Sequence, residues 1–138
     1  MRMAKRKFLT FRERLEKVYK SRDNVVFHLD EIDLQYQHFI ENDFVVPSEL
    51  LEKYNKAATL VDQFDEIIAE PSGTFKERRQ RKAMLLTFEQ IFESTAVQLR
   101  NAIVSAADCW NQQYAETGDD GFLAVYTEAR DNIVDIDD

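Results

Sequence analysis

A chain of 138 residues with 44% hydrophobic residues and a net charge of -8 fits one ordinary domain. Ten Phe and five Tyr are too many large apolar side chains for a disordered segment, and no apolar run approaches the ~20 residues that a membrane span needs. A single cysteine, Cys109, excludes an internal disulfide. No secretory signal is visible, and we expect a cytoplasmic protein.

The charge is unevenly distributed along the chain. Residues 1–22 hold nine basic side chains against two acidic ones, a net charge of +7, so the remaining residues carry -15. We therefore predict one helical domain over residues 1–138, with a basic N-terminal arm at 1–9 and an acidic C-terminal tail at 135–138.

The first helical region follows Thr10, because Thr10 and Glu13 form a T-x-x-E capping box. From Phe11 to Phe39, apolar residues recur at spacings of four and three, the seam of a coiled-coil-like helix. Residues 21–24, Ser-Arg-Asp-Asn, interrupt this seam with poor or neutral helix formers. The region forms one long helix or two nearly collinear ones, and we favour a break or kink at 21–24.

The next two helices are separated by clusters of Pro and Gly. A second helix is expected to begin near Glu49 and to stop before Pro71. Thr74 and Glu77 repeat the capping box, and the absence of Pro and Gly from 75 to 117 predicts one helix of ~60 Å. Its wide apolar stripe predicts contact with two or more helices. The stripe comprises Met84, Leu85, Phe88, Ile91, Phe92, Thr95, Leu99, Ala102, Ile103, Ala106, Trp110 and Tyr114.

A short terminal helix is predicted over about 122–134, where apolar residues again share one face. No run of alternating β-branched residues is convincing as a strand. The predicted fold class is therefore all-α: an elongated helical bundle of four or five helices with one long central helix at about 75–117.

Clustered Lys and Arg near the N-terminus form the first candidate functional surface, since they can neutralise phosphates and release counterions. A second basic cluster at 76–82 extends this surface if the helices pack suitably. Favourable i, i+4 pairs such as Glu13–Lys17 also fit a solvated helix face. The candidate nucleic-acid-binding residues are Arg2, Lys5, Arg6, Lys7, Arg12 and Arg14.

Four residues of the first helical region are of types that include metal ligands and are spaced to share one helix face. His28, Glu31, Gln35 and His38 are spaced by three, four and three residues, so a continuous helix places them on one stripe. The rest of the chain has no histidine and no matching set of ligands. We predict a polar flank beside the apolar seam, with no metal site.

Other signals of enzymatic chemistry are weak. Cys109 stands beside Trp110 and has no histidine near it in sequence, which favours a buried structural cysteine. Three glycines are too few for the usual phosphate-cradling loop. We predict no catalytic residues and no cofactor.

Residues 22–28, Arg-Asp-Asn-Val-Val-Phe-His, resemble the Arg and His motif of HEPN-type RNases, which are also small α-helical domains. The resemblance covers seven residues. It implies an RNase in which Arg22 and His28 contribute to a composite site formed by a dimer.

The acidic remainder of the chain allows a further alternative, an acidic nucleic-acid mimic whose carboxylates imitate a DNA backbone. A solvated face explains the same carboxylates. They are Glu31, Asp33, Glu41, Asp43, Asp62, Asp65, Glu66 and Glu70.

The function that these features favour is a non-enzymatic helical protein-interaction module: an adaptor, an assembly factor or an inhibitor. A helix of ~60 Å is longer than a small domain, so part of its apolar surface is left for a second copy of the chain to cover. We therefore predict a homo-oligomer as well as a protein partner. Nucleic-acid binding by the basic arm is the main alternative. We expect no contact with membranes.

Overall fold

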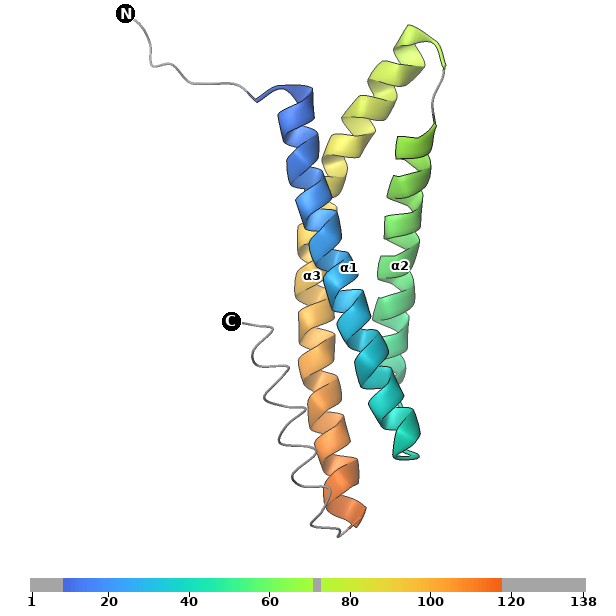
Figure 1. The fold of residues 1–138 in the computed structure, drawn as a ribbon, viewed down its shortest axis with the longest axis vertical. Coiled ribbons are helices and arrows are strands. Elements are labelled where there is room, and N and C mark those ends of the chain that lie inside the picture. Colours follow the sequence, from blue (N-terminus) through green and yellow to red (C-terminus); the bar gives the residue numbers. More distant parts are fainter. Residues whose placement is uncertain (1–8, 71–72, 118–138) are drawn as a thin grey trace, which may run out of the picture.

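The chain folds into three helices that pack side by side. The computed structural model describes residues 9–70 and 73–117, in which α1 spans Phe11–Glu41, α2 spans Ser48–Ala69 and α3 spans Phe75–Thr117. α1 and α3 run in the same direction and α2 runs in the opposite one (Figure 1). These described residues contain no strand, and the all-α class is confirmed.

The number and placement of the helices differ from the prediction of four or five helices around a long central one. Residues 75–117 do form one helix of 43 residues, but in a bundle of three helices none is enclosed by the others. The predicted terminal helix at about 122–134 and the acidic tail at 135–138 lie outside the described residues.

α1 is one continuous helix of 31 residues, so the predicted break at 21–24 is wrong. Val18 and Val25, on either side of that segment, are fully buried. Between them, Arg22 donates hydrogen bonds of 2.8 Å from both Nε and Nη2 to the carboxylate of Asp65 in α2. Burial on both sides and this bidentate pair keep the turn helical, because tertiary packing outweighs weak local propensity.

Both predicted capping boxes are confirmed. At the start of α1, the Glu13 N–H donates to the Thr10 hydroxyl over 3.1 Å and the Thr10 N–H donates to the Glu13 carboxylate over 3.0 Å. Hydrogen bonds of the same lengths join Glu77 and Thr74 at the start of α3. Immediately before this second box, Gly73 has a φ of 140°, a conformation that side-chain-bearing residues rarely adopt, so glycine makes this connection possible.

A tight turn ends α1 and directs the chain toward α2. Asp43 has a left-handed φ of 56°, and its N–H donates to the Ile40 carbonyl over 3.1 Å. The Phe44 N–H donates to the Phe39 carbonyl over 2.8 Å. This is a Schellman motif, in which the hydrogen bonds satisfy the last carbonyls of the helix. The Phe44 ring packs edge-on against Trp110 of α3, with centroids 5.3 Å apart.

Two side-chain amides set the register between α1 and α3. Gln35 donates from Nε2 to the carbonyl oxygen of Ile103 over 2.9 Å. Gln113 accepts from the N–H of Val45 over 2.7 Å and donates to the carbonyl of the same residue over 2.9 Å. Both pairs are separated by 68 residues in sequence, so the register stays constant along this part of the bundle.

The core lies along one side of α3, which packs on both α1 and α2, as its wide apolar stripe predicts. Ala102 and Ala106 are buried and allow close approach of a neighbouring backbone. Larger side chains fill the rest. The rings of Phe64 and Phe88 each lie with their centroids 5.3 Å from that of the fully buried Phe92, and such pairs add to the stabilisation that burial provides.

Replacing Phe92 by Ala is expected to lower the free energy of unfolding by about 3–5 kcal/mol, because the substitution removes a buried ring and leaves a cavity. Phe75→Ala is the matched control, since Phe75 is 72% exposed and its loss should change stability by no more than about 0.5 kcal/mol. Urea unfolding followed by circular dichroism measures both. Equal effects would show that Phe92 is not in a packed core.

Candidate functional site

The predicted nucleic-acid-binding residues belong to one end of the bundle. Arg12 and Arg14 are exposed at the start of α1. The other four candidates lie outside the described residues: Arg2, Lys5, Arg6 and Lys7.

A second basic segment reaches the same end of the bundle from α3. Lys82 places its Nζ atom 5.1 Å from the centre of the Phe11 ring in α1, a cation–π contact. The first turn of α1 therefore meets the third turn of α3, and Figure 1 shows that both helices start at this end of the bundle while the first turns of α3 lean away from α1. Five of the seven residues in this segment are cations: Lys76, Arg78, Arg79, Arg81 and Lys82.

Arg12 lies in the first turn of α1, and Lys76 and Arg78 lie in the first turn of α3, where the helix dipole disfavours cations. The N-terminal end of a helix carries partial positive charge, so a basic side chain there lowers stability. Glu13 and Glu77 act in the opposite sense. The backbone N–H groups of Thr10 and Thr74, followed by their hydroxyls, lower the pKa of these two carboxyl groups.

The predicted histidine stripe does not converge on one point. His28 is buried, whereas His38 is exposed to solvent. Gln35 is engaged with the backbone of α3, and burial raises the pKa of Glu31. Within residues 9–70 and 73–117, no three His, Cys, Asp or Glu side chains are grouped so that they could hold a metal ion.

The two residues that resemble the HEPN motif face different surroundings. Arg22 is engaged by Asp65, and these hydrogen bonds raise the pKa of Arg22. His28 is 2% exposed and belongs to the packed interior. In this arrangement neither side chain is presented to a substrate.

Cys109 is half-buried against the core rather than fully buried. Its sulfur accepts a hydrogen bond of 3.6 Å from Nε2 of Gln113, so the thiol belongs to the same contact that fixes the register of α1 and α3.

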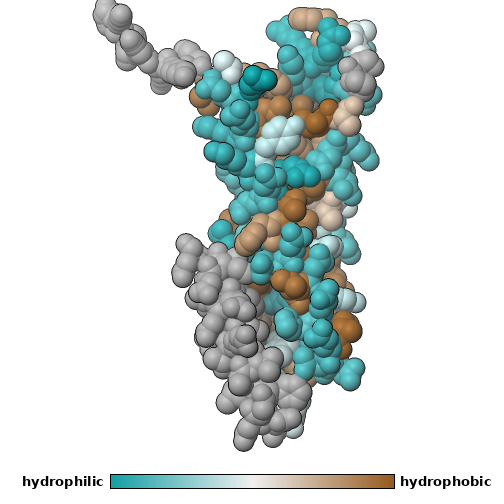
Figure 2. Space-filling view, viewed as in Figure 1, coloured by the Kyte–Doolittle hydropathy of each residue, from teal (hydrophilic) through white to brown (hydrophobic). Residues whose placement is uncertain are grey.

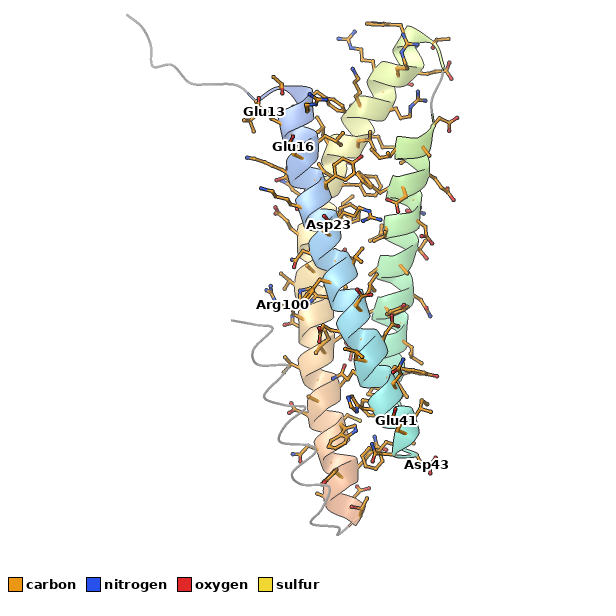
Figure 3. All side chains as sticks on the ribbon, in the orientation of Figure 1. Glu13, Glu16, Asp23, Glu41, Asp43 and Arg100 are labelled. Carbon is orange, nitrogen blue, oxygen red and sulfur yellow. The ribbon has the colours of Figure 1, made fainter. Side chains whose placement is uncertain are left out.

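The carboxylates considered for nucleic-acid mimicry are spread over the bundle. Figure 3 shows Glu41 and Asp43 at the end of α1, whereas Asp62 and Glu66 lie toward the far end of α2. Asp65 is engaged with Arg22, and Glu31 is half-buried. These carboxylates do not form one continuous face.

A groove of about 430 Å³ lies between α2 and α3. Its apolar part is formed by two side chains from each helix, and its polar part by lysines, amides and hydroxyls. Lys53 donates to Oε1 of Gln98 across the groove over 3.5 Å. The lining residues are Lys53, Lys56, Ala57, Leu60, Gln90, Ile91, Ser94, Thr95, Gln98 and Leu99.

The sequence analysis missed the groove because it placed Ile91, which lines the groove, in the apolar stripe expected to contact other helices, together with Met84 one turn or more earlier in the helix. They are 40% and 51% exposed, so that part of the prediction is wrong. One signal was available: Lys53 and Lys56 are the only cations between residues 23 and 75. Two lysines one turn apart on an otherwise acidic stretch mark the rim of the groove.

Comparison of the chain with models of known families, with curated proteins and with solved structures finds no match. None of the three described helices combines the length and the apolar character needed to cross a membrane.

The two capping boxes predict a pH dependence of stability. Because hydrogen bonds lower the pKa of Glu13 and Glu77 below the ordinary 4.5, the ionised carboxylates favour the folded state. This contribution is complete above 4.5 and is lost as the pH falls through the lower pKa of the folded state. The double variant Glu13→Gln/Glu77→Gln should therefore lose part of the acid sensitivity shown by the unmodified chain.

Urea unfolding at neutral pH and at several values below 4.5 measures this difference. A control variant, Glu16→Gln/Glu93→Gln, removes two exposed carboxylates that lie outside the capping boxes. Equal acid sensitivity in the two double variants would contradict the role of the capping carboxylates.

Proposed function

We propose that the protein is a non-enzymatic helical interaction module that self-associates, with the groove between α2 and α3 as its binding surface and a second copy of the chain as the occupant. One observation carries the proposal: the groove is apolar inside and polar at its rim, and neither α1 nor any other described segment covers it.

The composition of the groove suits a protein ligand. Ala57 and Leu99 are buried beneath it, while Leu60 is half-buried and Ile91 is 40% exposed. Removing such apolar surface from water gains roughly 25 cal/mol per Å². Protein interfaces combine an apolar centre with a polar rim in this way, and the groove has both.

The outer face of α1 offers a matching surface on a second copy. Asp23, Phe27, Asp30 and Leu34 are spaced by four, three and four residues, so they share one face of the helix. Phe27 is 49% exposed and Leu34 is 54% exposed. Figure 2 shows hydrophobic residues among hydrophilic ones on the side of the molecule where α1 lies.

The dimensions and charges of the two surfaces agree. Phe27 and Leu34 are about 10 Å apart along α1, and the α3 wall of the groove, residues 90–99, is about 14 Å long at the usual rise. The carboxylates on the α1 face would approach Lys53 and Lys56 at the rim. Opposite charges at the rim favour the correct orientation of the two copies.

This contact joins two different surfaces, so it is head-to-tail. Such an interface produces rings where the rotation closes and filaments where it does not. An adaptor, an assembly factor and an inhibitor are the roles that we retain for the module, and each would use the same groove for a helix of another protein.

Leu34→Glu and Ile91→Glu test the proposal, because one changes the α1 face and the other changes the groove. The unmodified chain should show a mass above 16.2 kDa by light scattering at micromolar concentration. Each variant alone should be monomeric. An equimolar mixture of the two variants should form dimers, since one intact α1 face and one intact groove remain in each mixed pair.

Val104→Glu serves as the control, because Val104 is exposed on α3 and does not line the groove. It should associate like the unmodified chain. A monomeric mass for the unmodified chain contradicts self-association. A mixture that stays monomeric contradicts the pairing of the α1 face with the groove.

A further inference from the structure

An exposed aromatic ring stands among the cations at the start of α3. Phe75 is the first residue of the helix and is 72% exposed, a larger fraction than for any other described phenylalanine. Arg78, Arg79 and Lys82 follow it at positions three, four and seven residues on, so the four side chains share one face of α3. This face extends over about 10 Å at the usual helical rise.

α1 extends the same surface. The contact of Lys82 with the ring of Phe11 joins the two helices at this point. Arg14 lies three residues after Phe11 and therefore next to it on the helix surface, and its side chain is exposed. The surface thus consists of one exposed aromatic ring on α3 and of cations on both helices, from two segments that are more than 60 residues apart in the chain.

The position of Arg78 is fixed by the backbone. Its Nη1 donates a hydrogen bond of 2.8 Å to the carbonyl oxygen of Gly73, and the guanidinium group retains other donors for a ligand. The N–H groups of Glu13 and Glu77 are already engaged in the capping boxes. The capping boxes thus reduce the number of free backbone donors at this end, and the exposed cationic side chains remain as donors for a ligand.

We propose that this basic end of the bundle, formed by Phe75, Arg78, Arg79 and Lys82 of α3 with Arg14 of α1, binds single-stranded nucleic acid. The cations contact successive phosphates, which releases counterions. Phe75 stacks on the face of an unpaired base. A duplex buries the faces of its bases within the stack, so the exposed ring favours a single strand.

The electrostatics of the whole chain restrict where the strand binds. The protein carries a net charge of -8, and its acidic regions repel a polyanion. At physiological salt, charges interact over a Debye length of about 8 Å, so the local cations act on a strand that approaches this end.

The test is binding of the full chain to fluorescein-labelled oligothymidylate, followed by fluorescence anisotropy at several salt concentrations. A labelled duplex and vesicles of anionic phospholipid are the comparison ligands. The single strand should bind most tightly. Phe75→Ala should weaken single-strand binding roughly tenfold, the effect of losing one stacked base, and should leave duplex binding unchanged.

A double variant with one substitution on each helix, Arg14→Gln/Arg79→Gln, tests whether the two segments form one surface. Two phosphate contacts fewer should reduce the slope of log affinity against log salt by about 1.4. The control Lys53→Gln/Lys56→Gln removes the same charge from the α2–α3 groove and should leave the slope unchanged. Circular dichroism of both double variants shows whether they remain folded, so that weaker binding by the first variant can be assigned to the lost phosphate contacts.

Two further variants distinguish this proposal from self-association through the groove and from binding by the N-terminal arm alone. Ile91→Glu, which disrupts the groove, should still bind the single strand at this end, so failure of self-association and failure of nucleic-acid binding are distinguishable. Deletion of residues 1–7 should weaken binding without abolishing it.

Four results would overturn the proposal. They are no binding of oligothymidylate at low salt, tighter binding to vesicles or duplex than to the single strand, equal salt slopes for the two double variants, and complete loss of binding on deletion of residues 1–7.

Discussion

Gln35 of α1 binds the backbone of Ile103 in α3, Gln113 of α3 binds the backbone of Val45 in the connection that follows α1, and α1 packs parallel to α3 in the register that these hydrogen bonds mark. Every other feature of the bundle follows from this parallel pair. α2 must return between the end of α1 and the start of α3, and it therefore runs antiparallel to both. α1 and α2 each cover part of the apolar stripe of α3. The side of α2 and α3 that α1 does not reach remains open as a groove.

The same parallel pairing brings two like-charged segments together. The first turns of α1 and the first two turns of α3 both carry cations, and the contact between Lys82 and Phe11 joins the two segments. The capping carboxylates Glu13 and Glu77 offset only part of this positive charge. The two proposed surfaces are therefore distinct in chemistry and in place: an apolar groove along the side of the bundle for a second copy, and a basic end with an exposed ring for a single strand.

Features with a local cause were predictable from the sequence, whereas features that depend on distant residues were not. The capping boxes at Thr10 and Thr74 and the length of the third helix depend on neighbouring residues alone. The break predicted at 21–24 was wrong because Asp65, which holds Arg22, is 43 residues away. The groove and the exposed Phe75 were missed because apolar periodicity identifies a stripe without showing which part of it a neighbouring helix covers. The meeting of the two basic segments could have been predicted from the short connections, which place the starts of the first and third helices at the same end.

The parallel arrangement of α1 and α3 is tested most directly by nuclear Overhauser effects between the two helices. Cross-peaks are expected between the ring protons of Phe11 and the side chain of Lys82, whose Nζ lies 5.1 Å from the ring centre. Cross-peaks are also expected between the Val45 amide and the side chain of Gln113. Cross-peaks from Phe11 to residues 110–117, in place of Lys82, would show that the two helices are antiparallel and would contradict the account.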